Sequence, residues 1–583
     1  MHSPQRLFLL LALLLPPAGL AAQPPASGLA SAHPAATDAG IAMLEAGGNA
    51  VDAAVAMAAA LAVVEPYGSG LGGGGFFLVR LAGEGTEAGR MFVVDGREVA
   101  PMAATEDMAI TADGVERSIL HDGPTSAGIP GLPAALVHLS EQYGALPLAD
   151  ALAPAIRLAA EGFTIDEGFV KRLERRVELV RASPAAAHTF LDRGALPETG
   201  SVLVQPVLAS TLRRMARAGH AGFYSGPVAE RLVSGVRAAG GIWQREDLAE
   251  YSIVERTPIV ATYHEAEVIS APPPSAGGVV LAIALGILER MDLARADPVT
   301  RTHLIIEALR RAYRDRAAEL GDPAFTDIPL ERLLSDTYIS ALAEGVDPDQ
   351  ATPSARLPDY RSGTGVPSAA PETPPGVADE EADISANTTH FSVMDAAGNR
   401  VAATLSINWW FGSGFMPPGT GVLLNNEMDD FVADPGVANA YGLVGTRANA
   451  IASGKRMLSS MSPTFVETPE RSAVLGTPGG SRITSMVLLA ALAVIEGRSA
   501  EAVVGAPRIH HQYLPDKLQY ESAALDPEQR AALEAMGHTL VERKRGYGNM
   551  QLVIWDRVSD TVNAAADPRG AGKAAVVERA PPQ

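Results

Sequence analysis

The sequence contains no cysteine, and aromatic residues make up only 5% of its 583 positions. Without a thiol, the chain can form no disulfide, carry no lipid on a cysteine and use no thiolate as a nucleophile or metal ligand. Nucleophilic catalysis would therefore have to come from serine, threonine, lysine or a carboxylate. In an oxidising compartment the fold would rest on its apolar core.

Positive charge is also scarce. The formal net charge is -21 and the isoelectric point is near 5.0. Nucleic acids and anionic lipid surfaces are bound through basic patches, so we expect neither as a partner. With 47% apolar and 19% charged residues, the chain is expected to fold into a globular α/β protein with a sizeable core.

Only short apolar stretches occur. Residues 1–22 have a basic start, an apolar run over Leu7–Leu15 and small residues up to Ala22, which is the pattern of a secretory signal peptide. We therefore expect the mature protein in the periplasm or secreted. A second stretch, Val51–Val64, contains Asp52 and is short for a bilayer. It predicts a buried helix, and no membrane anchor is expected.

Helical signals follow the predicted signal peptide. Thr37 can cap a helix that stops near Gly47, and Asn49 can cap a second helix that runs to Val64. We expect the two to form a helical hairpin packed on a sheet. Amphipathic segments separated by proline and glycine turns continue over residues 130–350, as in helices that cover a sheet.

The glycine-rich segment Gly68–Gly75 contains a G-x-G-x-x-G match. A dinucleotide-binding loop needs a strand before it and a helix after it. Here Pro66 and a helix come before, and residues 76–80 read as a strand. The segment therefore predicts a tight turn in which backbone approaches backbone, and no cofactor is expected.

Composition changes sharply before the last third of the chain. Residues 352–386 are rich in Pro, Ser, Thr, Gly, Asp and Glu and lack apolar periodicity, which predicts a flexible, exposed tail. Short β-type runs follow at 388–394, 399–407 and 421–424, with a hairpin turn at 395–399. A mobile tail therefore leads directly into a core strand.

Common catalytic motifs are missing. No complete G-x-S-x-G elbow occurs, although Gly412–Gly414 and Gly480–Arg482 contain parts of one. His510 and His511 lack the spacing of a zinc site, and we interpret them as neutral packing residues. The sequence predicts no metal site.

Thr388 differs through its position. Cleavage between Asn387 and Thr388 would make this threonine N-terminal, and its hydroxyl would then have a base on the same residue. An unperturbed α-amine has a pKa of about 7.7 to 8.0, which suits proton transfer at neutral pH. An exposed tail, a scissile asparagine and a threonine at the start of a strand supply this layout.

Six segments, in order along the chain, resemble those of the γ-glutamyltransferase (glutathione hydrolase) family. They are Gly47–Ala54 (GGNAVDAA), Asp95–Pro101 (DGREVAP), Asn387–Val393 (NTTHFSV), Leu424–Phe431 (LNNEMDDF), Leu458–Thr464 (LSSMSPT) and Gly476–Arg482 (GTPGGSR). The resemblance implies an N-terminal-nucleophile hydrolase with an αββα four-layer sandwich. It also implies a precursor cut into two intertwined subunits that form a heterodimer, a large one (23–387, ending in the 352–387 tail) and a small catalytic one (388–583).

The resemblance also implies roles for individual residues. Thr388 would attack the γ-carbonyl, Ser406 would hydrogen-bond its amine, and the amides of Gly479 and Gly480 would form the oxyanion hole. The remaining roles concern the glutamyl head group: Arg97 for its α-carboxylate, Asn408, Glu427 and Asp430 for its α-ammonium, and Ser459 and Ser460 for completing the carboxylate pocket. Residues 434–442 resemble a lid loop with Tyr441 as its latch.

The implied activity is cleavage of glutathione and other γ-glutamyl compounds, with transfer to water or to amino acid or dipeptide acceptors. Two departures stand out: Ser406 replaces a common threonine, and we expect the rings of Trp409 and Trp410 to border the acyl pocket. A cephalosporin or glutaryl acylase on the same fold and an uncleaved, non-catalytic binding protein are the alternatives.

Overall fold

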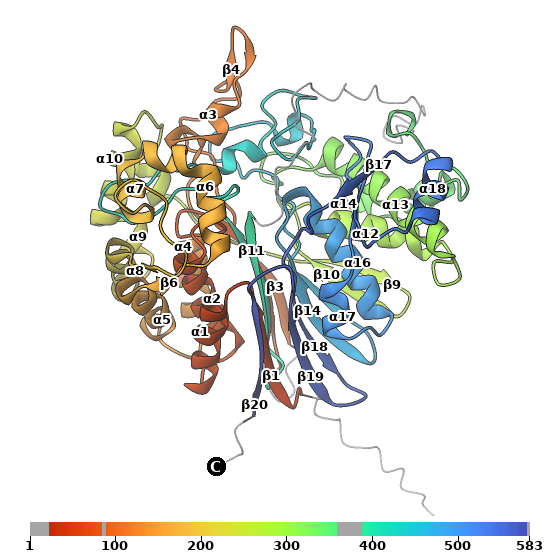
Figure 1. Cartoon of the computed structure of the whole chain (residues 1–583), viewed down its shortest axis with the longest axis horizontal. Coiled ribbons are helices and arrows are strands. Elements are labelled where there is room, and N and C mark those ends of the chain that lie inside the picture. The colour runs from red at the N-terminus through yellow and green to blue at the C-terminus, as the bar shows by residue number, and fades with distance from the viewer. Residues whose placement is uncertain (1–22, 84–88, 358–386, 580–583) are drawn as a thin grey trace, which may run out of the picture.

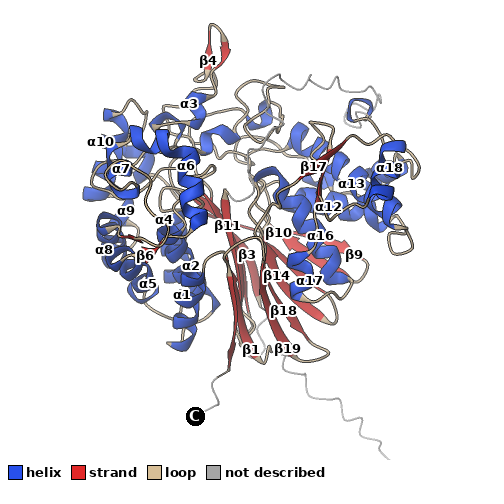
Figure 2. Ribbon diagram, viewed as in Figure 1, coloured by secondary structure: helices blue, strands red, loops and turns tan. Residues whose placement is uncertain are grey.

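The computed structural model describes residues 23–83, 89–357 and 387–579. Two β-sheets lie face to face in the middle of the molecule, and helices cover the outer face of each sheet (Figure 1). Figure 2 shows the resulting order of layers as helix, sheet, sheet and helix. This arrangement confirms the predicted αββα sandwich. The predicted signal peptide lies outside the described residues.

The first sheet has seven strands in the order β20-β1-β11-β12-β2-β3-β8. The bounds are β1 (Ala26–Ser31), β2 (Gly74–Leu81), β3 (Arg90–Gly96), β8 (Val254–Arg256), β11 (Thr388–Met394), β12 (Arg400–Ser406) and β20 (Lys573–Glu578). All neighbouring pairs are antiparallel. Strands from both sides of the predicted cleavage site are neighbours in this sheet: β1 lies between β20 and β11, and β12 lies next to β2.

The second sheet has six strands in the order β19-β18-β14-β13-β10-β9. They are β9 (Ile259–Tyr263), β10 (Ala266–Ser270), β13 (Thr464–Glu467), β14 (Arg471–Gly476), β18 (Gln551–Asp556) and β19 (Thr561–Ala566). Large apolar side chains such as Phe76, Phe465 and Trp555 fill the layer between the sheets. Because both sheets draw strands from both parts of the chain, a cut before Thr388 would leave two pieces that share one core.

The two outer layers are helical. Helices on the side of the first sheet are α1 (Pro34–Glu45), α2 (Ala50–Val64), α4 (Leu132–Tyr143), α5 (Leu148–Glu161), α6 (Glu167–Ala182), α7 (Pro184–Phe190), α8 (Pro206–Ala218), α9 (Ala221–Tyr224) and α10 (Gly226–Ala238). Those on the other side are α12 (Gly277–Glu289), α13 (Pro298–Glu319), α14 (Leu330–Leu333), α15 (Asp336–Glu344), α16 (Ile483–Ile495), α17 (Ala500–Gly505) and α18 (Pro527–Ala535). Among the described residues, no helix combines the length and apolarity that a membrane span requires.

The predicted helical hairpin is confirmed, except for its first residue. Asn49 caps α2 in a capping box, and every residue of α2 is buried. The predicted start at Thr37 is wrong, because Pro34 occupies the first helical position and the His33 ring accepts from the backbone N–H of Ala35. The Thr37 hydroxyl instead donates to a backbone carbonyl of β20.

The glycine-rich turn brings backbones close together, as predicted. A Cβ added to Gly72 would lie 2.0 Å from the carbonyl oxygen of Leu423, and one added to Gly73 would lie 2.0 Å from that of Ser406. The predicted strand 421–424 is wrong, because only Leu424 forms a bridge, to Gly72. At this crowded turn, the backbone pairing between the two segments does not extend beyond that one bridge.

Residues 352–357, the first part of the predicted exposed tail, are partly buried. Ser354 and Leu357 are buried, and the Ser354 hydroxyl donates to the carbonyl oxygen of Tyr513. Residues 358–386 lie outside the described residues. The prediction of an exposed tail is therefore wrong for Ser354 and Leu357, whereas Pro353, Ala355 and Arg356 are exposed as predicted.

Candidate active site

The predicted nucleophile lies where the two central strands meet. Thr388 is the first residue of β11 and pairs with Ser406, the last residue of β12. The Thr388 hydroxyl donates to the Ser406 hydroxyl over 3.2 Å. Thr388 is 7% exposed and lines a pocket. Both hydroxyls are therefore fixed at the rim of the core by the register of the sheet.

Ser406 makes further contacts at the predicted cleavage site. Its hydroxyl oxygen accepts from the backbone N–H of Asn408 over 2.7 Å, and its hydroxyl donates to the carbonyl oxygen of Asn387 over 3.3 Å. Asn387 is buried. One serine thus contacts both the hydroxyl of Thr388 and the carbonyl of the peptide bond that is predicted to break.

Arg97 forms a buried ion cluster beyond the end of β3. Its Nη1 lies 2.7 Å from Glu427 and 3.4 Å from Glu98, and its Nη2 lies 2.5 Å from Asp430. Its Nε donates to the carbonyl oxygen of Met457 over 3.2 Å. The Arg97 side chain is 0% exposed, so each of its guanidinium nitrogens is used inside the protein.

A single pocket brings most of the predicted site residues together. Its lining includes Arg97, Thr388, Ser406, Asn408, Glu427, Asp430, Tyr441, Ser459, Ser460 and Gly480. These residues come from five separate segments of the sequence: Arg97, 388–408, 427–441, 459–460 and Gly480. Asn387 and Gly479 do not line the pocket, although each precedes a residue that does.

The glycine pair follows β14 and opens a short 3₁₀ turn, η6 (Gly480–Arg482). Gly479 has φ 146° and Gly480 has φ 56°, which are backbone conformations that favour glycine. A Cβ on Gly480 would lie 2.3 Å from the ring of Tyr441. Both the backbone angle and the available space therefore require glycine here.

Tyr441 holds the loop over the pocket. Its hydroxyl donates to the side-chain oxygen of Asn408 over 2.7 Å. The Gln512 amide donates to the Tyr441 carbonyl oxygen over 3.0 Å. The Tyr441 ring lies 5.6 Å from that of Trp409. Residues 434–442 are thus tied down on two sides.

The two tryptophans have different surroundings. Neither is among the residues that line the pocket. Trp410 packs into the apolar core between the first sheet and its helices, whereas Trp409 lies between the rings of Tyr441 and His121. Trp410 therefore lies away from the pocket, whereas Trp409 borders it through the ring of Tyr441.

The two serines of the 458–464 segment have different neighbours. The Ser459 hydroxyl oxygen accepts from the backbone N–H of Met461 over 3.1 Å. The Ser460 hydroxyl oxygen accepts from Nη2 of Arg316 over 3.3 Å. Both line the pocket beside Asp430.

Comparison with known proteins agrees with this geometry. The family model described as gamma-glutamyltranspeptidase matches residues 36–577. The chain belongs to the γ-glutamyltranspeptidase family. A glutathione hydrolase proenzyme from Pseudomonas sp. (strain A14) is 40% identical over 510 residues, which cover 86% of this chain and 84% of that protein.

Solved structures of the γ-glutamyltranspeptidase and acylase type share the fold. A cephalosporin acylase from Bacillus halodurans has a TM-score of 0.80 at 28% identity and covers 99% of both chains. The gamma-glutamyltranspeptidase of Helicobacter pylori has a TM-score of 0.53 at 36% identity, over 55% of this chain and 92% of that chain. The αββα sandwich is thus that of an N-terminal-nucleophile hydrolase.

Electrostatics in this γ-glutamyltranspeptidase site are dominated by burial. Burial raises the pKa of Glu98 to about 7 and the pKa of Glu427 well above its ordinary value, against the pull of Arg97. Burial disfavours the charged form of Arg97, but the neighbouring carboxylates outweigh it and raise the pKa of the guanidinium. Burial thus favours the protonated form of Glu98 and Glu427 relative to an exposed glutamate.

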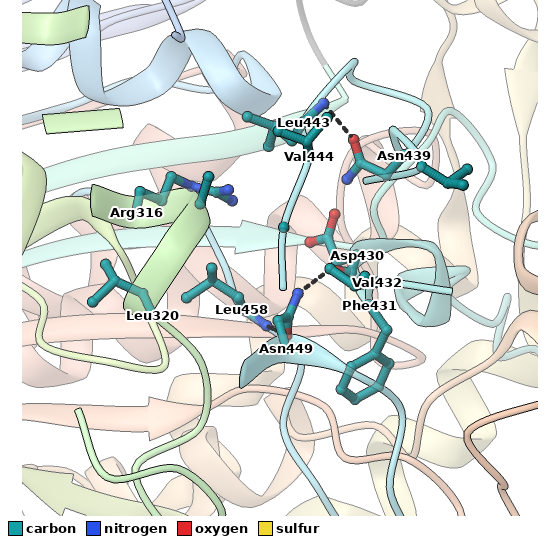
Figure 3. A pocket seen from close by; sticks show the side chains of 13 residues that line it. Arg316, Leu320, Asp430, Phe431, Val432, Asn439, Leu443, Val444, Asn449 and Leu458 are labelled. Atoms are coloured by element: carbon teal, nitrogen blue, oxygen red, sulfur yellow. Dashed lines mark hydrogen bonds between the residues drawn. The ribbon is translucent and has the colours of Figure 1, made fainter. Parts of the chain in front are cut away.

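Sequence reasoning missed Glu98 and Arg316. Glu98 follows Arg97 in the DGREVAP segment, but the sequence alone does not indicate that the two side chains form an ion pair. Arg316 belongs to a helix whose sequence looks like a covering helix, and only the fold brings it beside Ser460 and Asp430 (Figure 3). No local pattern signals that position.

The histidine pair is structural, as predicted. His510 and His511 are both buried. Burial lowers the pKa of His511 to about 4 and that of His510 well below its ordinary value. Both rings are therefore neutral at physiological pH, and His510 is hydrogen-bonded to Ser485.

Proposed function

We propose that this chain is a γ-glutamyltransferase and glutathione hydrolase that cleaves itself between Asn387 and Thr388. The observation that carries the proposal is the position of Ser406, which contacts the Thr388 hydroxyl and the Asn387 carbonyl at the edge of one pocket. The same pocket contains Arg97 and its carboxylate partners. An intramolecular nucleophile and a charged binding site thus lie side by side.

Self-cleavage needs no group outside this chain except water. The Thr388 oxygen attacks the Asn387 carbonyl carbon, and Ser406 donates to the oxyanion that develops. The C–N bond breaks, its nitrogen takes the proton, and Asn387 becomes an ester on Thr388. Water then hydrolyses this ester and releases the Asn387 carboxylate, the Thr388 hydroxyl and a free α-amine.

The freed threonine would carry out the second reaction. Its α-amine accepts the hydroxyl proton while the oxygen attacks the γ-carbonyl carbon of the substrate. The amides of Gly479 and Gly480 stabilise the oxyanion, and the leaving amine takes the proton. Water or the amino group of an amino acid or dipeptide then cleaves the acyl-enzyme.

Recognition of the substrate follows from the charges in the pocket. The α-ammonium of a glutamyl group would be held by Asp430, Glu427 and Asn408, and its α-carboxylate by Arg97. Ser459 and Ser460 would donate hydroxyl hydrogen bonds to the same carboxylate. A zwitterionic head group matches a pocket that contains both signs of charge.

The proposal includes processing and location. Residues 1–22 would be removed on export, and the precursor would give subunits 23–387 and 388–583 in the periplasm or outside the cell. Both sheets contain strands from both parts of the chain, which supports a stable heterodimer after cleavage. Glutathione and other γ-glutamyl compounds are the proposed substrates.

Acylase activity is the second candidate, favoured by the structural likeness to a cephalosporin acylase over the whole chain. A glutaryl group has no α-ammonium. In this pocket it would leave Asp430 and Glu427 without a cationic partner from the substrate, and this costs binding energy. The carboxylate cluster therefore favours γ-glutamyl donors.

The test compares γ-glutamyl p-nitroanilide with glutaryl p-nitroanilide on the purified wild-type protein. We expect the γ-glutamyl compound to be cleaved with the higher kcat/KM, and Thr388→Ala to cleave neither compound and to remain one chain. A higher kcat/KM for the glutaryl compound would establish the acylase alternative. An uncleaved wild-type chain without activity on either compound would favour a binding protein.

A further inference from the structure

Arg316 is a buried cation on α13, at the back of the candidate pocket. It is 6% exposed, and its Nη2 donates to the Ser460 hydroxyl oxygen over 3.3 Å. Its Nε has no hydrogen-bond partner, and it forms no ion pair with a carboxylate among residues 23–83, 89–357 and 387–579. Burial of a guanidinium without a paired carboxylate lowers the stability of the folded protein, which suggests that Arg316 has a functional role.

Other arginines of the same helix are paired. Arg310 and Arg311 are also buried, and both form ion pairs with Glu307 on the neighbouring turn. Packing of α13 therefore does not by itself leave arginines without a carboxylate. Arg316 is the exception on the side of the helix that approaches Ser460 and Asp430.

A cavity lined by Arg316 shares lining residues with the donor pocket. Arg316, Asp430, Leu443 and Leu458 all line it, and Asp430 and Leu443 also line the pocket that contains Thr388. In Figure 3 the guanidinium points from α13 toward Asp430 and the Leu443–Val444 strap. The positive charge therefore faces the site of the substrate head group.

The balance of charges in the pocket suggests a role for Arg316. Arg97 already contacts three carboxylates, and its Nε binds a backbone carbonyl. A substrate α-carboxylate must therefore share Arg97 with these groups. Arg316 supplies a second positive charge nearby that no carboxylate neutralises by direct contact.

Hydrogen-bond direction gives the second argument. The Ser460 oxygen accepts from Arg316, so its single hydroxyl hydrogen must point elsewhere. Within the part of the chain that the structure describes, the Ser460 hydroxyl donates to no other group. That hydrogen is available for a carboxylate that enters the pocket.

We propose that Arg316 is a positioning residue that determines specificity for donors with an α-carboxylate. It orients the Ser460 hydroxyl as a donor and adds the positive charge that this carboxylate requires. The inference rests on the proposed γ-glutamyl donor site and adds to it a residue of the large subunit. A merely structural role, such as a cation in the last turn of α13, would serve all donors equally.

The test uses two donors, γ-glutamyl p-nitroanilide and its analogue with a neutral α-carboxamide, with the mature enzyme and the variants Arg316→Met and Arg316→Lys. Arg316→Met should raise KM for the γ-glutamyl donor roughly 10- to 100-fold and change kcat only a few-fold, because a charge-assisted contact is lost. KM for the carboxamide donor should stay within about threefold. Arg316→Lys should show a smaller rise for the first donor alone.

The matched control is Arg301→Met, which removes an arginine from the same helix where it pairs with Glu496 at the surface. This variant should retain wild-type kinetics with both donors. Self-cleavage, followed on a denaturing gel, reports folding separately from donor binding. Should Arg316→Met fail to accumulate, Arg316→Lys is tested by the same comparison of donors.

An equal loss with both donors, or unchanged kinetics with both, would overturn the inference. Either result would leave the proposed function intact as long as the wild-type enzyme cleaves the γ-glutamyl donor. A wild-type enzyme that is cleaved but inactive on that donor would instead refute the proposed function.

Discussion

Replacement of Ser406 by alanine should slow self-cleavage strongly. The variant loses the donor that lies 3.3 Å from the Asn387 carbonyl oxygen and the acceptor that lies 3.2 Å from the Thr388 hydroxyl. Removal of a well-placed oxyanion donor costs about 2.7 to 4 kcal/mol in enzymes. At 3.3 Å the contact is long, so we expect about 1.4 to 2.7 kcal/mol here, or a 10- to 100-fold slower cleavage.

The assay is the time course of conversion of pulse-labelled precursor into two fragments on a denaturing gel. Ser406→Thr keeps the hydroxyl and should convert at nearly the wild-type rate. Ser392→Ala is the matched control, because Ser392 is a buried serine of β11 whose hydroxyl donates to Gln551 and touches neither Asn387 nor Thr388. It should also convert normally.

Conversion of Ser406→Ala within about threefold of the wild-type rate would refute this reasoning, since that rate difference corresponds to less than 1 kcal/mol. Equal slowing of Ser392→Ala would show that general loss of packing, rather than the Ser406 contacts, limits cleavage.

Three further predictions concern the pocket, its loop and pH. Arg97→Met should raise KM for γ-glutamyl donors at least about 100-fold and lower the free energy of unfolding by about 3–5 kcal/mol, because buried carboxylates lose their cation; an unchanged KM would remove Arg97 from donor binding. Tyr441→Phe loses the hydrogen bond to Asn408, worth about 1 kcal/mol, so limited proteolysis within residues 434–442 should be about fivefold faster, and equal rates would contradict the latch. Burial lowers the pKa of His390 from 6.5 to about 3, so below about pH 6.5 the unfolded chain binds a proton that the folded chain refuses, and the stability from this residue is lost as pH falls. Between about pH 6 and 4, the free energy of unfolding of His390→Gln should therefore depend less on pH than that of the wild-type protein. The difference in slope should correspond to at most one bound proton. Equal slopes of unfolding free energy against pH in the two proteins would contradict this.

Much of the fold could be predicted because local signals agree with the tertiary structure. Asn49 caps a wholly buried helix, and the β-type run that begins at Thr388 forms a strand in the centre of a sheet. The start of α1 was missed because Pro34 and His33 form a cap that is outside the usual residue types. A strand at 421–424 was wrongly predicted, because the crowding at Gly72 depends on distant segments.

The site was predictable only where short motifs carry it. Thr388, Arg97 and Asp430 lie in conspicuous segments and lie in one pocket. Arg316 could not be found in this way, because its position depends on how α13 packs against Ser460. The misplacement of Trp410 has a similar cause, since its place in the apolar core depends on tertiary packing.

N-terminal sequencing of the smaller fragment of the purified protein tests the central claim most directly. Self-cleavage by Thr388 predicts two fragments, the smaller of which begins Thr-Thr-His-Phe-Ser, and one intact chain in Thr388→Ala. An intact wild-type protein, a fragment that begins at any other residue, or two fragments in Thr388→Ala would contradict it.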